Sequence, residues 1–277
     1  MEALGFGHRR VLRLRRLVGR RTAREAERRF VVEGVRVLAE AVAAGWPVES
    51  VFWDPALAAD EEGMALVGRC RAAGAQVDRL APRVLDRVTD TATPQPVLAV
   101  VPYGDVSLER LRGGTMLVVC VDVRDPGNVG TVLRSAEAAG ADGLVCCDGS
   151  VDVYNPKTVR ASAGSLFHVP VVAGGEAAEV LEQIGGLGDK RLGTVAAGGT
   201  DYTRCDLTVP LAFVLGNEAS GLPERVAPLL DDLVTIPMTG RSESLNVGMA
   251  ASVLCFEAAR QRRARGAATG RAAKVVG

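Results

Sequence analysis

Two apolar runs near the C-terminal end of this chain each stop at a residue that breaks regular structure. Leu211–Leu215 meets Gly216 and then the carboxylate of Glu218, and Leu233–Ile236 meets Pro237. Runs without polar interruption are typical of strands that a parallel sheet buries on both faces. A buried strand that ends at Gly or Pro leaves N–H and C=O groups available at its end. These two strand ends are therefore candidate positions for a small-molecule site.

The rest of the chain also alternates between apolar runs and helical periodicity, which predicts an α/β protein. We expect strands at residues 30–33, 48–53, 76–80, 97–101, 116–121, 144–147, 169–172, 192–196, 211–215 and 233–236, the last of which closes the sheet. We expect helices over the first thirty residues and at residues 35–44, 61–73, 82–88, 128–139, 156–162 and 246–263. The predicted organisation is a small α/β domain with a basic N-terminal helix at residues 1–107, an α/β domain with a parallel sheet at residues 108–265, and a mobile basic tail at residues 266–277.

The six cysteines and two histidines restrict the class of protein. The cysteines show no C-x-x-C spacing and mostly lie in apolar segments, so we expect reduced core thiols in a cytoplasmic protein. His8 and His168 are the only imidazoles, and we therefore expect no metal site. No apolar run approaches the roughly 18 residues of a membrane span, and the first residues lack the apolar core of a signal peptide. We accordingly expect no membrane partner.

The net charge of zero conceals two basic ends. Residues 1–36 hold eleven Arg and four Glu, and residues 260–277 hold five Arg, one Lys and no acid. Basic ends of this kind suit the phosphate backbone of a nucleic acid. The candidate RNA-binding residues, which recur at helical spacing, are Arg9, Arg13, Arg16 and Arg20. The alternative is a solvated helix in a chain that uses 30 Arg against 3 Lys.

Five polar positions are candidates for chemistry, and each has a purely structural alternative. Arg134 lies on an otherwise apolar helix, where a guanidinium either extends to solvent or clamps a phosphate. Glu218 either binds a ligand or caps the following turn, and Ser244 and Asn246 also fit helix N-capping. The Gly-rich turn at Asn128 either presents N–H groups to an anion or is only a tight turn before a helix, and it lacks the G-x-G-x-x-G and P-loop patterns of nucleotide-binding loops.

The order and spacing of these residues resemble a known family. N-x-G-x-x-x-R-S-A at residues 128–136 resembles the first motif of the SpoU (TrmH) RNA 2′-O-ribose methyltransferases of the SPOUT superfamily. L-G-N-E-x-x-G-L at residues 215–222 is similar to the second motif, and I-P-M-x-G-x-x-x-S-L-N-V at residues 236–247 to the third. The resemblance covers residues 114–265. F-V-V-E-G at residues 30–34 resembles, less specifically, the small substrate-binding domain that many members carry.

The resemblance implies a SPOUT fold, in which the C-terminal segment passes through a loop as a trefoil knot. The residue pattern alone would not predict a knot, because knots are nearly absent among protein folds. The family also implies S-adenosylmethionine as cofactor and a homodimer with the final helix in its interface. The implied cofactor-binding residues are Leu215, Gly216, Ile236, Met238 and Leu245. The implied catalytic residues are Arg134, Asn128, Glu218, Ser244 and Asn246.

The implied reaction is attack of a ribose 2′-hydroxyl on the sulfonium methyl group, for which the protein positions the hydroxyl and eases its deprotonation. Arg134 is either the base, as proposed for the family, or a cationic clamp, because a guanidinium resists deprotonation. The separate N-terminal domain favours ribosomal RNA, in particular 23S rRNA, over transfer RNA. Two other classes stay open: a non-catalytic RNA-binding protein on the same fold, and a nicotinamide-dependent oxidoreductase, which the missing fingerprint disfavours.

Overall fold

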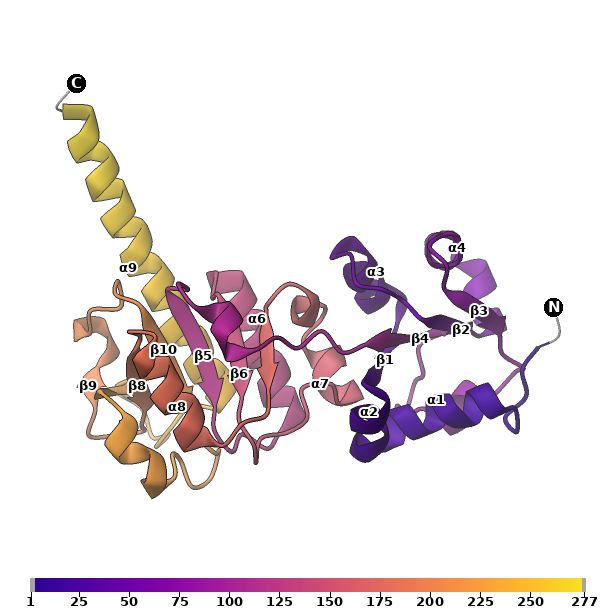
Figure 1. Ribbon diagram of the computed structural model, residues 1–277, viewed down its shortest axis with the longest axis horizontal. Helices are drawn as coiled ribbons and strands as arrows, with labels where there is room; N and C mark the ends of the chain where they lie inside the picture. The colour runs from indigo at the N-terminus through magenta and orange to yellow at the C-terminus, as the bar shows by residue number, and fades with distance from the viewer. Residues whose placement is uncertain (1–2, 276–277) are drawn as a thin grey trace. The chain divides into compact units, whose positions relative to one another are not determined.

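The structure consists of two compact units formed from interleaved stretches of the chain. The computed structural model describes the backbone of residues 3–275 and the side chains of residues 3–266. One unit contains Met1–Gly104 and Tyr154–His168, and the other contains Asp105–Val153 and Val169–Gly277 (Figure 1). Tyr154–His168 falls within the predicted domain at residues 108–265, whereas the contacts of this segment lie within the N-terminal unit.

The N-terminal unit is built around a four-stranded sheet in the order β1-β4-β2-β3. β4 is antiparallel to β1 and β2, whereas β2 and β3 are parallel. The strands are β1 (Arg29–Glu33), β2 (Ser50–Trp53), β3 (Gln76–Arg79) and β4 (Val97–Pro102). The helices are α1 (Arg9–Gly19), α2 (Arg21–Glu27), α3 (Val35–Ala43), α4 (Glu61–Ala72), α5 (Leu85–Val88) and α7 (Pro156–Ala161). The predicted α/β class of this domain is confirmed, with a mixed sheet.

Two helices replace the single helix expected over the first thirty residues. The backbone is extended at Arg20, with φ −129° and ψ 117°, so that α1 ends and α2 begins there. The buried guanidinium of Arg24 donates hydrogen bonds to the carbonyl oxygens of Leu17 (2.9 Å) and Val18 (3.1 Å). These carbonyls belong to the last turn of α1, which has no further helical donors. Arg24 therefore closes the end of α1 and stabilises the bend.

The segment Tyr154–His168 is attached to the N-terminal unit by polar contacts. Arg160 Nη1 lies 2.6 Å from Oε2 of Glu33, whose side chain is buried. Trp46 Nε1 donates a hydrogen bond of 3.1 Å to the carbonyl oxygen of Phe167. Because an unpaired buried carboxylate is costly, the guanidinium of Arg160 is part of what allows Glu33 to be buried. A sequence pattern in α7 alone gives no sign of a partner more than a hundred residues away.

The C-terminal unit is built around a seven-stranded sheet in which every neighbouring pair of strands is parallel. The predicted parallel sheet is therefore confirmed. The order is β7-β6-β5-β10-β8-β11-β9, formed by β5 (Met116–Cys120), β6 (Gly143–Cys146), β7 (Val171–Ala173), β8 (Lys190–Thr194), β9 (Thr200–Asp201), β10 (Leu211–Leu215) and β11 (Asp232–Thr235). The prediction that residues 233–236 close the sheet is wrong, because the short strand β9 pairs with the outer side of β11.

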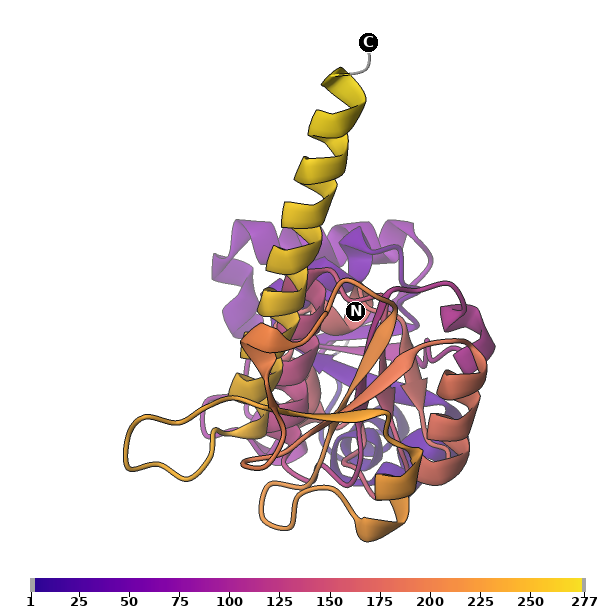
Figure 2. The ribbon, with the colours of Figure 1, turned by 90° about the vertical axis from the view of Figure 1, so that its left-hand side faces the viewer.

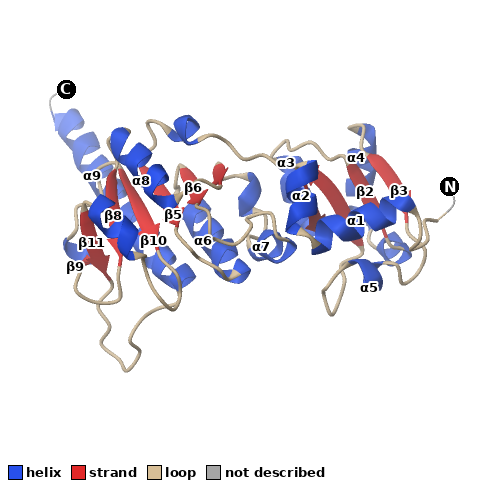
Figure 3. Ribbon diagram, turned by 60° about the horizontal axis from the view of Figure 1, so that its bottom comes forward, coloured by secondary structure: helices blue, strands red, loops and turns tan. Residues whose placement is uncertain are grey.

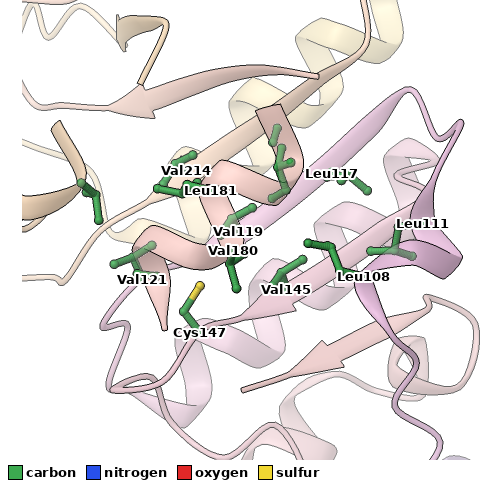
Figure 4. Close-up of a cluster of buried hydrophobic side chains, with 14 residues drawn as sticks. Leu108, Leu111, Leu117, Val119, Val121, Val145, Cys147, Val180, Leu181 and Val214 are labelled. Carbon is green, nitrogen blue, oxygen red and sulfur yellow. The ribbon is translucent and has the colours of Figure 1, made fainter. Parts of the chain in front are cut away.

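Helices cover both faces of this sheet (Figure 3). On one face, α8 (Ala177–Gly186) packs Val180, Leu181 and Ile184 into a buried cluster with apolar side chains of β5 and β10 (Figure 4). α8 was not predicted from the sequence. On the other face, α6 (Pro126–Ala139) and α9 (Val247–Val275) pack against each other.

A small residue lets α6 and α9 approach closely. A Cβ added at Gly248 would lie 2.8 Å from the Cβ of Thr131, closer than side chains pack. One turn further along, the hydroxyls of Ser135 and Ser252 lie 2.6 Å apart. α9 continues to Val275, beyond its expected end. The predicted mobility of the tail at residues 266–277 stays a prediction, since the side chains from residue 267 onward lie outside the described residues. The strand order does not define how loops thread, and the trefoil knot stays a prediction.

Parallel pairing places the carboxyl ends of β5, β8, β10 and β11 at one edge of the sheet. The first sequence motif lies on α6, which follows β5, and the second and third lie at the ends of β10 and β11 and in the loops after them. The fold therefore brings segments about 120 residues apart to one edge. The loop between β11 and α9 extends away from the sheet (Figure 2). No helix in the described part of the chain has both the length and the apolar character that crossing a membrane requires.

Candidate cofactor and catalytic site

A cavity of about 360 Å³ lies at this edge of the C-terminal sheet. Its walls come from the ends of β8, β10 and β11, from the loops that follow β10 and β11, and from the start of α9. The lining residues include Thr194–Ala196, Gly216–Ala219, Gly221, Val234, Ile236, Met238 and Ser244–Val247. In parallel α/β sheets, ligands bind in this position, outside the carboxyl ends of the strands.

The loop after β10 is a tight hairpin that requires glycine at its base. The N–H of Asn217 donates to the carbonyl of Gly221, and the N–H of Gly221 donates to the carbonyl of Asn217, both over 2.9 Å. A Cβ at Gly216 would lie 2.4 Å from the carbonyl carbon of Gly221. Asn217 Nδ2 also donates to the carbonyl of Asp122, which links this hairpin to the loop after β5 (2.9 Å). Gly216 is therefore required by the protein's own backbone, whatever ligand the cavity holds.

A chain of hydrogen bonds joins the three motif segments, from the start of α9 through α6 to the hairpin after β10. Asn246 Nδ2 donates to Asn128 Oδ1 over 2.8 Å, and Asn128 Nδ2 donates to Glu218 Oε1 over 2.8 Å. The amide orientations follow from the partners, since a carboxylate can only accept. Asn246 Oδ1 also accepts from the N–H of Gly248 and caps α9. Asn246 therefore both caps α9 and lines the cavity, and its catalytic role stays a prediction.

Glu218 is held as a carboxylate by donors from the loop after β5. Its oxygens accept hydrogen bonds from the backbone N–H groups of Asp125 (3.3 Å) and Arg124 (3.4 Å) in addition to the Asn128 amide. Partial burial opposes ionisation, but the hydrogen bonds outweigh it and lower the pKa of Glu218 below its usual value. A carboxyl group held in this way is a poor proton acceptor near neutral pH, and its evident work is to orient Asn128.

The structure does not bring every predicted site residue together. Gly216, Glu218, Ile236, Met238, Ser244, Leu245 and Asn246 line the cavity, and Asn128 reaches it through its hydrogen bonds. Leu215 is fully buried and does not line the cavity, since its carbonyl oxygen accepts from Val121 within the sheet. Arg134 is exposed on α6, does not line the cavity, and contacts none of the other candidates among the described residues.

Some lining residues were not expected from the sequence. Thr194 ends β8 and Val195 and Ala196 follow it, in a stretch predicted as strand, and Ala250 and Leu254 come from the first turns of α9. Asp122 adopts a left-handed conformation with φ 59° two residues after β5 and binds the Arg124 guanidinium through both carboxylate oxygens (3.0 and 3.1 Å). An Asp after a buried strand was the available signal for this turn.

The four candidate RNA-binding arginines differ in their surroundings. Arg13 pairs with Glu49 and, over 2.6 Å, with Glu27, and these contacts raise its pKa. Arg16 lies 3.3 Å from Glu27 but is more than half exposed. In the described part of the chain, the exposed side chains of Arg9 and Arg20 have no carboxylate partner. The helical spacing therefore predicts the same role for all four arginines, although Arg13 is neutralised by carboxylates of the protein and the others remain available to bind a phosphate.

The thiols lie apart from this chemistry. All six cysteines are free, and five of them are buried. Burial raises the pKa of Cys147 and of Cys255 to about 12, so that neither is a thiolate at neutral pH. Among the described residues, His, Cys, Asp and Glu side chains do not gather in a group of three that could hold a metal ion.

The fold and cavity define an α/β domain of the kind that holds a small cofactor beyond the ends of parallel strands, joined to a second α/β unit. Residues 115–256 match the model of the SpoU rRNA Methylase family, and residues 8–99 match the MRM3-like substrate binding domain. This chain belongs to the SpoU rRNA methylase family.

Characterised relatives resemble the chain over most of its length. It is 35% identical over 254 residues to a 23S rRNA (uridine(2479)-2′-O)-methyltransferase of Streptomyces viridochromogenes, covering 89% of this chain and 88% of the relative. It is 32% identical to the Bacillus subtilis 23S rRNA (guanosine(2553)-2′-O)-methyltransferase RlmP, covering 82% and 87%. The crystal structure of the SpoU methyltransferase AviRb from S. viridochromogenes in complex with AdoMet is similar with a TM-score of 0.81 at 32% identity, covering 93% of this chain and 100% of that one. An AdoMet-bound rRNA methyltransferase from Sinorhizobium meliloti gives a TM-score of 0.80 at 29% identity, covering 94% and 97%.

Proposed function

We propose that this protein is an S-adenosylmethionine-dependent RNA methyltransferase that modifies a ribose 2′-hydroxyl in 23S rRNA. The observation that carries the proposal is the hydrogen-bond chain from Asn246 through Asn128 to Glu218, at the edge of the cavity. It joins the three motif segments of a family whose relatives are 23S rRNA 2′-O-methyltransferases.

The cavity suits the proposed cofactor. Its volume of about 360 Å³ is that of a small-molecule site, and it has both backbone and apolar walls. Gly216, Ile236, Met238 and Leu245 would hold the cofactor, largely through the strand ends. When bound, S-adenosylmethionine supplies an electrophilic sulfonium methyl group.

We assign different roles to the side chains around the cavity. Glu218 is a positioning residue, because its oxygens are already occupied and its pKa is lowered. Asn128 and Asn246 hold each other, and the second amide proton of each could bind the ribose. Ser244, exposed at the cavity, is the proposed neighbouring contact. Arg134 is proposed as a cationic clamp on a substrate phosphate, since an exposed guanidinium keeps its proton.

We further propose a homodimer formed through α9. Met249 and Phe256 are 58% and 46% exposed and lie seven residues apart, hence on one face of the helix. Phe256→Asp should convert the dimer to a monomer in sedimentation velocity, and a wild-type protein that sediments as a monomer would contradict the proposal. The free thiols also suit a reducing compartment, and we propose that the protein is cytoplasmic.

The test of the function is a map of ribose methylation. Purified protein, labelled S-adenosylmethionine and total RNA lacking the modification should give one labelled position, which we expect in 23S rRNA. Labelling of transfer RNA instead would establish the alternative substrate. Cofactor binding in calorimetry without methylation of either RNA would contradict the proposed activity, and absence of cofactor binding would leave a non-catalytic RNA-binding protein.

A further inference from the structure

The N-terminal unit has a basic hollow of its own. A hollow of about 830 Å³ extends along α1 and α5. Six arginines line it, Arg9, Arg13, Arg15, Arg16, Arg20 and Arg87, against one carboxylate, Asp90. From Arg9 to Arg20 the hollow follows α1 for about 16 Å at 1.5 Å per residue.

Most of this charge is not neutralised within the protein. Arg13 is paired with Glu49 and Glu27, and Arg16 approaches Glu27 only to 3.3 Å. Arg9 and Arg20 have no carboxylate partner in the part of the chain that the structure describes. Guanidinium groups that stay uncompensated on a concave surface attract a polyanion and match phosphate oxygens in a fork.

The hollow also lacks the surface that single strands use. Proteins bind unpaired nucleotides by stacking bases on exposed aromatic rings. Here the ring next to the hollow is Phe6, and the guanidinium groups of Arg15 and Arg87 cover it at 5.4 and 3.6 Å from its centroid. Double-stranded RNA, in contrast, is recognised by shape and by its phosphates. The chemistry of the hollow therefore favours a duplex over an unpaired strand.

We propose that the hollow along α1 and α5 binds the phosphate backbone of a double-stranded segment of the substrate RNA, through Arg9, Arg15, Arg16, Arg20 and Arg87. Arg13 takes no part, because Glu49 and Glu27 already hold it. The inference rests on the proposed function for the identity of the substrate, but its site is separate from the cofactor cavity. It assigns sequence-independent affinity to this surface and leaves the choice of nucleotide to other parts of the protein.

The test compares two RNAs and two matched double variants of the full-length protein. Arg9→Gln with Arg20→Gln removes two unpaired charges from the hollow, whereas Arg69→Gln with Arg71→Gln removes two exposed charges from α4, outside it. Fluorescence anisotropy is measured with a 16-base-pair RNA duplex of arbitrary sequence and with one of its strands, at several salt concentrations.

We expect the first variant to bind the duplex at least about 10-fold more weakly and to lower the salt slope by about two, one for each lost phosphate contact. The α4 variant should bind the duplex as the wild type does. Unchanged duplex affinity in the first variant would overturn the proposal, as would an equal loss for the single strand. Calorimetry with S-adenosylmethionine should give wild-type affinity for both variants. Duplex binding that depends on Arg9 and Arg20 without methylation of any RNA would contradict the proposed function alone.

Discussion

The two concave surfaces of this protein hold their polar groups in opposite ways. Around the cofactor cavity, Asn128, Glu218 and Asn246 bind one another, and the backbone of the Gly216 hairpin closes on itself. Along α1, charged side chains such as Arg9 extend into solvent without a partner among the described residues. The first surface depends on geometry and the second on charge. We therefore expect a single substitution at the cavity to cause a large loss of cofactor binding or activity, and each substitution in the hollow to cause a smaller loss of RNA affinity.

Arg134 does not fit this comparison, and its substitution therefore tests it. It is a solvent-exposed guanidinium in the same unit as the cavity, whose asparagine and glutamate side chains are hydrogen-bonded to one another. Arg134→Ala should reduce kcat for methyl transfer by roughly 1,000-fold or more, because the proposed clamp on a substrate phosphate would act mainly in the transition state. S-adenosylmethionine affinity should stay within a few-fold. Arg110→Ala, an exposed arginine elsewhere in the same unit, is the control. A near-normal rate for Arg134→Ala would remove this residue from the reaction.

Gly216→Ala tests whether geometry controls the cavity. The added Cβ would lie 2.4 Å from the Gly221 carbonyl carbon, so the hairpin has to move. We expect S-adenosylmethionine affinity to fall by about 100-fold, which is roughly 2.7 kcal/mol. Gly240→Ala in the neighbouring loop has no atom within 4 Å of the new Cβ and should bind normally. Equal affinities in calorimetry for the two variants would show that the hairpin does not shape the cofactor site.

Glu218→Gln removes the charge at the end of the hydrogen-bond chain while keeping the shape of the side chain. One carboxylate oxygen becomes an NH₂ group that faces N–H donors, at a cost of about 1–3 kcal/mol. The free energy of unfolding should fall by that amount, and methyl transfer should fall about 10-fold or more. Glu224→Gln, an exposed carboxylate on the segment after the hairpin, should change neither. Denaturant titration that finds both variants equally stable would mean that Glu218 does not hold the loops.

Apolar segments could be predicted from the sequence more reliably than the partners of polar and charged side chains. Buried strands such as β5 and β10 are apolar throughout, and this local pattern is sufficient to place them. The motif resemblance predicted which loops meet, but not that Asn128 and Asn246 would bind each other, because that contact depends on how α6 and α9 pack. α8 was missed although its apolar positions have helical spacing, since glycines flank and end it.

Charge was harder to interpret than apolar pattern. The spacing of the arginines predicted one face of a helix, and Arg9, Arg13 and Arg16 do lie on α1, whereas Arg20 lies at the extended break before α2. The pairing of Arg13 depends on Glu49, which lies 36 residues away and just before β2. A sequence pattern contains no information on such a partner, and it therefore predicted the same role for Arg13 as for Arg9.

Glu49→Gln has the smallest expected effect. It tests the comparison most specifically, because it should lower the stability of the protein while raising its affinity for RNA. Glu49 accepts hydrogen bonds from Arg13 and, over 2.7 Å, from Arg29. Loss of this partly exposed network should lower the free energy of unfolding by no more than about 1 kcal/mol. The same change leaves two guanidinium groups with one carboxylate fewer, and the affinity for duplex RNA should rise by about 2- to 3-fold.

The pH dependence of this variant provides the check. Hydrogen bonds and charge from Arg13 and Arg29 lower the pKa of Glu49 below its usual value of 4.5, against the opposing effect of burial. A carboxyl group whose pKa is lowered by folding stabilises the folded protein fully at any pH above its pKa in the unfolded chain. This contribution is lost as the pH falls through its pKa in the folded protein. The difference in unfolding free energy between wild type and Glu49→Gln should therefore be constant near pH 7 and shrink below about pH 4.5. A difference that does not change with pH, or an RNA affinity that falls, would show that Glu49 does not hold Arg13 back from the RNA.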